Sequence, residues 1–199
     1  MIALVNYGAG NIRSVTKAME ASRADVKVTE CPEDVFAADK VVLPGVGAFG
    51  KAVEALEERK LVEPLRKVIR EGKPFLGICL GAQLLFESSE ENPGVEGLGV
   101  LPGKVIRFPA GLKVPHLGWN QVFPKKDHFI WTDVPEGSYF YFAHSYYFAP
   151  ANPDLVLGET EYSHPYASVV GRDNITGIQF HPEKSQKWGL KILENFIKQ

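Results

Sequence analysis

The first half of the chain alternates short apolar runs with stretches of helical periodicity. Strands are predicted at 2–6, 26–29, 40–43 and 75–78, the first and the last of them buried. Apolar residues recur at helical spacing over 12–22, 49–58 and 61–71, and Gly72 follows as a helix stop signal. Strands that alternate with helices predict a parallel, doubly wound sheet.

The second half is richer in strands. Between Gly97 and Gly177, turns of Gly, Pro and Asn separate runs at 103–108, 119–123, 139–147, 155–162, 167–170 and 175–180. An amphipathic helix over 188–197 closes the chain. We therefore expect an α/β fold with a mainly parallel central sheet flanked by helices, antiparallel strands added in the second half, and one domain over residues 1–199.

Composition narrows the classes of function. The 199 residues carry a net charge of −2 without long basic runs, which gives no electrostatic reason to expect binding to nucleic acid or to an anionic membrane. The chain lacks the run of about 18 apolar residues that a membrane helix needs. With two cysteines and no C-x-x-C pair, we expect a cytoplasmic protein without disulfides or a structural metal site.

One stretch carries a candidate nucleophile. Cys79 directly follows the predicted strand 75–78, has Gly77 and Gly81 on either side, and precedes a helical pattern that includes Leu80, Leu84 and Leu85. This is the strand–turn–helix arrangement of a nucleophile elbow. The helix start favours a thiolate, and the N–H of Leu80 lies where an oxyanion would form. The alternative is a buried cysteine beside a tight glycine turn.

Three glycine-bearing loops should share one edge of the sheet. The loops 7–11, 44–47 and 77–81 each follow a predicted strand, and open α/β sheets bind ligands beyond the carboxyl ends of their strands. The first loop superficially suggests a dinucleotide fingerprint, but Arg13 occupies a position where that pattern requires glycine. We interpret it as a tight turn whose position also suits contact with a partner.

A thiolate that transfers acyl groups needs a base, and that base needs an orienting group. Of the five histidines, His181 lies at the end of an apolar strand and precedes Pro182 and Glu183. Pro182 favours an extended conformation at His181, so Glu183 two residues on can reach one imidazole nitrogen while the other faces Cys79. The alternative is a histidine at a strand–helix junction, with Glu183 capping the last helix.

An aromatic stretch from Tyr139 to Phe148 predicts a strand with two different faces. Its even positions from Phe140 onward, including His144, share one face, and Tyr139, Tyr141, Ser145 and Tyr147 share the other. One interpretation is a strand buried on the first face and half-covered on the second. The other places Tyr141 and Trp119 against a partner subunit, since exposed aromatic residues anchor interfaces, and Lys184 also within reach of it.

These motifs together resemble those of the class I, or triad, glutamine amidotransferases. The resemblance rests on Gly77-Ile-Cys79-Leu-Gly81-Ala-Gln83, on His181-Pro182-Glu183 and on Pro44-Gly45-Val46-Gly47, and it covers essentially the full chain. It implies that Cys79 attacks the side-chain amide of glutamine, that His181 is general base and then acid, and that Glu183 orients it. It implies no cofactor.

The resemblance also assigns the substrate pocket. It implies an oxyanion hole from backbone N–H groups of Leu80 and of Val46 or Gly47. It further implies that Gln83 contacts the amino-acid end of glutamine. The remaining pocket residues implied are Gly47, Leu80, His144, Ser145 and Tyr146.

Residues 6–11, 44–49, 115–120 and 181–185 narrow the resemblance to a glutaminase of histidine biosynthesis. That subfamily implies a heterodimer with a (β/α)8-barrel cyclase subunit, which receives the ammonia, and Asn11 joins the residues expected at this interface. The alternatives are a glutaminase of anthranilate, aminodeoxychorismate or pyridoxal phosphate synthesis, an elbow-cysteine peptidase or γ-glutamyl hydrolase, and a non-catalytic thiol sensor.

Overall fold

The computed structural model describes residues 1–8 and 10–199. The expected glycine-rich turn at 7–11 includes Ala9, which lies outside the described residues. The first half follows the predicted alternation and comprises β1 (Ile2–Val5), α1 (Ile12–Ala21), β2 (Val26–Thr29), α2 (Pro32–Ala37), β3 (Lys40–Leu43), α3 (Phe49–Glu58), α4 (Val62–Arg70), β4 (Phe75–Ile78), α5 (Leu80–Gln83) and β5 (Phe86–Ser89).

The second half is mainly strands, as expected. It comprises β6 (Leu101–Arg107), β7 (His116–Pro124), β8 (Ser138–His144), β9 (Tyr146–Pro150), β10 (Val156–Glu161), β11 (Pro165–Arg172), β12 (Ile175–Ile178) and the closing helix α6 (Gln186–Lys198). Short 3-10 turns occur at Phe129–Trp131, Pro153–Leu155 and Pro182–Lys184.

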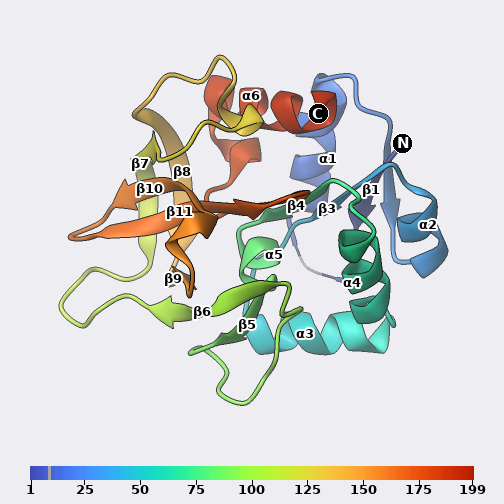
Figure 1. The fold of residues 1–199 in the computed structure, drawn as a ribbon, viewed down its shortest axis with the longest axis horizontal. Coiled ribbons are helices and arrows are strands. Elements are labelled where there is room, and N and C mark those ends of the chain that lie inside the picture. The colour runs from blue at the N-terminus through green and yellow to red at the C-terminus, as the bar shows by residue number, and fades with distance from the viewer. Residues whose placement is uncertain (9) are drawn as a thin grey trace.

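The central sheet has the order β2-β1-β3-β4-β12-β11-β10-β7-β8. Strands β2, β1, β3, β4 and β12 pair in parallel, whereas β12, β11, β10, β7 and β8 pair antiparallel. In Figure 1, α1 and α6 cover one face of the parallel part, while α3, α4 and α5 lie on the other. The expected fold class is therefore confirmed.

The two faces of the sheet build two hydrophobic clusters. Along β1, Ala3 and Val5 point into the cluster that holds α3 and α4, whereas Ile2 and Leu4 join the cluster with α1 and α6. This division follows from the two-residue period of a strand. Because both faces are covered, a continuous apolar run is the pattern such a strand requires, and β1 has it.

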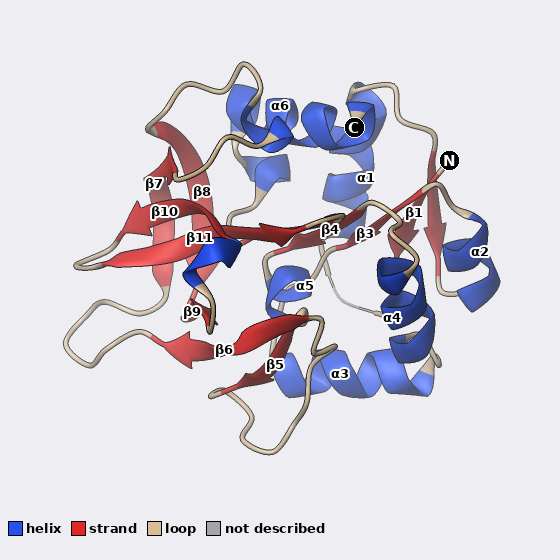
Figure 2. Cartoon of the chain, viewed as in Figure 1, coloured by secondary structure: helices blue, strands red, loops and turns tan. Residues whose placement is uncertain are grey.

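Three local predictions need correction. The helix expected after Cys79 is only one turn, since α5 ends at Gln83 and the chain re-enters a strand, β5, at Phe86. The single strand expected over 139–147 is two strands, because the chain bends at Ser145 and β9 leaves β7 to pair with β6 and β11. Helix α2 escaped prediction, although Pro32 at its first position is a helix-start signal. Figure 2 shows the resulting mixture of helix and strand.

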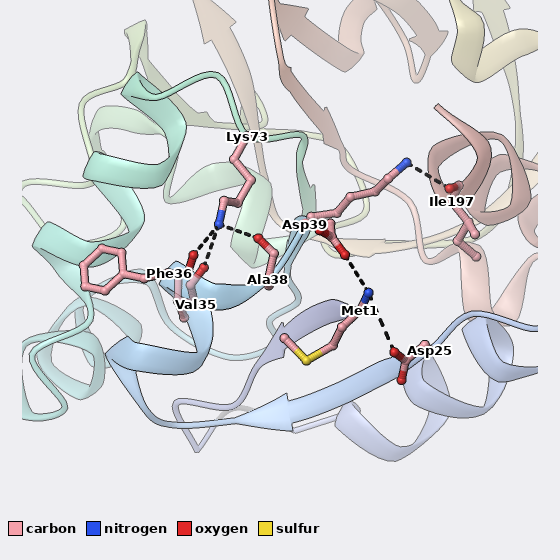
Figure 3. A network of polar contacts seen from close by, with 9 residues as sticks. Met1, Asp25, Val35, Phe36, Ala38, Asp39, Lys73 and Ile197 are labelled. Atoms are coloured by element: carbon pink, nitrogen blue, oxygen red, sulfur yellow. Dashed lines mark hydrogen bonds and ion pairs between the residues drawn. The ribbon is translucent and has the colours of Figure 1, made fainter.

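The amino-terminal edges of the parallel strands are fastened by polar contacts (Figure 3). The ammonium group of Lys73 donates to the carbonyl oxygens of Val35, Phe36 and Ala38, where α2 ends. A cation at a helix C-terminus satisfies free carbonyls and opposes the negative end of the helix dipole. The N-terminal ammonium of Met1 lies 2.7 Å from a carboxylate oxygen of Asp39. The candidate site lies at the opposite edge of the sheet, where the parallel strands have their carboxyl ends.

No helix in the described part of the chain is both long and apolar enough to cross a membrane.

Candidate active site

The turn after β4 holds Cys79 in a strained backbone conformation. Its φ of 52° and ψ of −110° lie outside the common regions for a residue with a side chain. A Cβ on Gly77 would lie 2.7 Å from Cα of Ala82, and one on Gly81 would collide with the carbonyl oxygen of Leu43. Both flanking positions therefore require glycine, because the helix turns back onto the strands immediately after the cysteine.

The sheet brings His181 and Glu183 to the same edge. β4 and β12 are parallel neighbours with Ile78 opposite Ile178, so the residues after each strand share one end of the sheet. Nδ1 of His181 lies 2.8 Å from Oε1 of Glu183, and both side chains are buried. Cys79 is close enough to His181 to raise the pKa of its imidazole. The three residues predicted from the sequence therefore do meet.

The charge of His181 follows from this arrangement. Burial alone would lower the pKa of its imidazole, but the contacts with Cys79 and Glu183 outweigh burial and raise the pKa from 6.5 to about 10. At neutral pH the imidazolium form of His181 is thus favoured beside the sulfur of Cys79. An imidazolium next to a sulfur nucleophile can protonate a leaving group as soon as the nucleophile has attacked.

A small cavity of about 170 Å³ opens beside the sulfur. The residues that line it are Val46, Gly47, Cys79, Leu80, Gln83, Glu91, Pro115, Ala143, His144, Ser145 and Tyr146. All of the residues expected to contact glutamine are among them. Glu91 was not anticipated from the sequence, and its Oε2 accepts a hydrogen bond from the backbone N–H of Phe49, at 2.8 Å.

The predicted oxyanion hole is occupied by the protein itself. The backbone N–H of Leu80 donates to the carbonyl oxygen of Gly45, at 3.3 Å. Gly47 has a φ of 106°, and a Cβ there would meet nothing within 4 Å. An oxyanion on Leu80 would therefore have to displace the Gly45 carbonyl, and Gly47 supplies the backbone freedom for such a movement.

His116 and His144 form a buried pair next to the cavity. Nδ1 of His116 lies 3.2 Å from Nε2 of His144, whose own Nδ1 lies 2.8 Å from the carbonyl oxygen of Tyr146. A carbonyl only accepts, so Nδ1 of His144 carries a proton and its Nε2 accepts. Asn120 approaches Nε2 of His116 at 3.3 Å. The hydroxyl of Tyr166 lies 3.2 Å from each histidine.

Both histidines are held neutral. Burial lowers the pKa of His116 to about 4. It also lowers that of His144 to about 3, a shift that the contact with Tyr146 opposes and the charges of His116 and His181 reinforce. The strand expected at 119–123 begins earlier, at His116 in β7, and the antiparallel register sets His116 opposite His144. Only this long-range pairing reveals the contact.

The residues expected at a partner interface form a surface cluster beside the triad. Trp119 is 45% exposed and faces Tyr141 across the β7–β8 pair, with ring centroids 6.0 Å apart. Nζ of Lys184 lies 5.7 Å from the centroid of the Tyr141 ring. Asn11, by contrast, donates its amide to Oε1 of Glu183, so its side chain contacts the triad itself.

The chain belongs to the glutamine amidotransferase class-I family, whose sequence model matches residues 3–199. Among its relatives, imidazole glycerol phosphate synthase subunit HisH of Desulfitobacterium hafniense is 50% identical over 198 residues, which are 100% of this chain and 94% of the relative. The same subunit of Aquifex aeolicus is 51% identical over 97% of this chain and 94% of the relative. That of Methanocaldococcus jannaschii is 48% identical over 99% and 98%.

Solved structures agree with this fold. A crystal structure of a glutamine amidotransferase superimposes with a TM-score of 0.78, at 20% identity, over 98% of this chain and 99% of that one. A structure of PurLQS from Thermotoga maritima gives the same TM-score at 18% identity, over 99% and 97%. The family model and the relatives at about 50% identity confirm the resemblance inferred from the motifs.

Proposed function

We propose that this protein is the glutaminase subunit of imidazole glycerol phosphate synthase and supplies ammonia for histidine biosynthesis. The observation that carries the proposal is the position of His181 between Cys79, which lines a small cavity, and Glu183, which holds its other side. The naming of full-length relatives at about 50% identity supports the particular synthase. We place the protein in the cytoplasm, as one domain over residues 1–199 without a cofactor.

The reaction follows from the residues in order. The thiolate of Cys79 attacks the side-chain amide carbon of glutamine, and the resulting oxyanion is held by the N–H groups of Leu80 and of Val46 or Gly47. One such donor contributes about 2.7–4 kcal/mol to the transition state. The imidazolium of His181 protonates the departing nitrogen, and ammonia leaves. His181, now neutral, takes a proton from water, which hydrolyses the thioester to glutamate.

The substrate roles of the cavity residues belong to the same proposal. Gln83 and the segment His144, Ser145 and Tyr146 contact the amino-acid portion of glutamine, together with Gly47 and Leu80. The cavity of about 170 Å³ suits one amino-acid side chain better than an extended peptide, which favours a glutaminase over a peptidase.

The proposed partner is a (β/α)8-barrel cyclase subunit that forms a heterodimer with this chain. The cluster of Trp119, Tyr141 and Lys184 is the proposed contact surface, since aromatic residues anchor protein interfaces. Asn11 lies at the same edge and would connect that surface to Glu183.

Glutamine hydrolysis, measured with and without the cyclase subunit and its nucleotide ligand, tests the function. We expect both additions together to stimulate hydrolysis strongly, because the Gly45 carbonyl occupies the oxyanion donor of Leu80 in the isolated chain. Replacement Cys79→Ala should abolish the use of glutamine but leave synthesis from added ammonium salts intact in the complex. Full activity on glutamyl peptides without a partner would instead identify a hydrolase.

A further inference from the structure

A fully buried carboxamide, Gln179, lies directly beside the nucleophile. In the parallel pair β4–β12, Ile78 lies opposite Ile178, so the next residues, Cys79 and Gln179, are adjacent at the carboxyl edge. The N–H of Cys79 donates to the carbonyl of Ile178 at 2.8 Å, and the N–H of Gln179 donates to that of Ser168 at 2.9 Å. The Gln179 side chain has 0% exposure, and a buried amide must find partners for its polar atoms.

The partners of Gln179 fix which way its amide points. Nε2 of Gln83 lies 3.1 Å from the carbonyl oxygen of Tyr146, which only accepts, so this atom of Gln83 is the nitrogen. The same nitrogen lies 3.2 Å from the Gln179 amide, which must therefore present its oxygen there. Nε2 of Gln179 is then the atom that lies 3.7 Å from Sγ of Cys79.

We propose that Gln179 is a catalytic residue that donates an N–H to the thiolate of Cys79 and ties the nucleophile to the glutamine-binding residue Gln83. This role rests on the proposed glutaminase function. A hydrogen bond to the charged form of a group stabilises that form, so the donor keeps more of the sulfur ionised at a given pH. The oxygen of the same amide accepts from Gln83, which also donates to the carbonyl of Tyr146. Gln179 therefore fixes the position of the sulfur relative to these two pocket residues.

The other titratable groups around the sulfur are identified by the packing. His181 contacts it from the end of β12, and Glu183 acts on it through His181. Tyr7, after β1, interacts with it through charge, and His144 and Glu91 line the same cavity. A substitution at Gln179 leaves the chemical identity of each of these groups unchanged. A shift in the ionisation of Cys79 on that change can therefore be attributed to the lost N–H.

Alkylation by iodoacetamide over a range of pH tests the proposal on the full chain. The modification of Cys79 and of the exposed Cys31 is followed separately by peptide mass spectrometry, and Cys31 serves as an internal reference in every sample. Replacement Gln179→Met keeps the volume but removes the donor. We expect the pH midpoint for Cys79 to rise by about one unit, with the Cys31 profile unchanged.

The matched control is Ser168→Ala, which disturbs an equally buried neighbour that does not contact the sulfur. It should leave the Cys79 midpoint where it is. An unchanged midpoint in Gln179→Met, or an equal shift in Ser168→Ala, overturns the proposal. The readout does not require glutaminase activity, so a wild-type chain inactive with its partner would refute the proposed function separately.

A second measurement needs no substitution. In the wild-type chain, the side-chain amide resonance of Gln179 should shift with pH in step with the ionisation of Cys79, because the amide proton contacts the sulfur. A Gln179 resonance that passes through that pH range without a step contradicts the proposal, even if Gln179→Met fails to fold.

Discussion

Cys79 illustrates how much of the chemistry depends on the surroundings of single atoms. Its backbone has a φ of 52°, and its sulfur is close to the imidazole of His181 and to the amide of Gln179. Since α5 is only one turn long, its dipole stabilises a negative charge at its start less than the dipole of a longer helix would. The groups in position to act on the sulfur are therefore mainly these two side chains.

The charge of His181 gives a prediction at this scale. Replacement Glu183→Gln removes a carboxylate 2.8 Å from Nδ1, so the pKa of His181 should fall from about 10. An NMR titration of the imidazole measures this change, and the resonance of His128, whose ring accepts from the backbone N–H of Ile130, provides the control in the same sample. A His181 pKa unchanged by the substitution would show that Glu183 does not stabilise the imidazolium.

The same contact makes stability depend on alkaline pH. The pKa of His181 is higher in the folded chain than the 6.5 of an unperturbed histidine, so its charged form adds stability that is complete below pH 6.5 and is lost as pH rises towards 10. We expect the free energy of unfolding to decrease over this range, and to decrease less in Glu183→Gln. Denaturant titrations at several pH values measure it, and parallel curves for the two proteins would contradict the expectation.

At the scale of elements, the turn between β4 and α5 depends on two glycines. A Cβ on Gly81 would enter the carbonyl of Leu43 in β3, whereas Gly72, with a φ of 83°, has open space around it. We expect Gly72→Ala to cost about 1–3 kcal/mol through backbone strain alone. Gly81→Ala should cost more than about 4 kcal/mol or prevent folding, because strand and helix must separate. Equal losses in thermal or denaturant unfolding would refute the steric explanation.

The pairing of β7 with β8 gives a prediction for acid. His116 and His144 have pKa values lowered to about 4 and 3, so between pH 6.5 and pH 4 the unfolded chain binds protons that the folded chain does not. Stability should therefore fall as pH falls through this range.

The substitution His116→Gln removes one of the two groups that bind these protons in the unfolded chain. The slope of the unfolding free energy against pH should then become shallower by up to about 1.4 kcal/mol per unit. The control is Phe140→Leu, because Phe140 is a buried residue of β8 that does not titrate. This substitution should lower the stability and leave its dependence on pH unchanged. If His116→Gln kept the wild-type slope, His116 would not be the buried neutral base described here.

At the scale of the whole molecule, exposed aromatic residues lie at two opposite sides. In Figure 1, β7 and β8, the strands of Trp119 and Tyr141, lie at one side of the molecule, and α2 lies at the other. Phe36 of α2 is thus an exposed aromatic residue like Trp119, but it lies on the other side of the molecule. Only the β7–β8 side lies beside the triad.

This arrangement predicts which aromatic residues support assembly. Trp119→Ala and Tyr141→Ala should each weaken binding of the cyclase subunit, by about 2 kcal/mol if they act as anchors. Phe36→Ala should leave the affinity unchanged. Titration calorimetry with the purified barrel subunit measures the three affinities, and equal affinities would remove the aromatic surface from the interface.

The sequence alone indicated most of the elements and the candidate reactive groups. Strands β1 and β4 are buried and appear as apolar runs, and β1 to β4 were predicted nearly to the residue. The candidate nucleophile could be proposed because two glycines and a strand end are local features, and His181 with Glu183 because proline fixes a two-residue spacing. Each of these depends on neighbours in the chain.

The tertiary structure alone decided which residues meet across strands that are far apart in the sequence, because the register of those strands sets these contacts. The bend at Ser145 sends β9 to new partners, the pairing of β7 with β8 sets His116 against His144, and the pairing of β4 with β12 sets Gln179 against Cys79. The hydrogen bond from Leu80 to Gly45 likewise joins two separate loops. No periodicity records such contacts, because they form only when segments far apart in sequence are packed side by side.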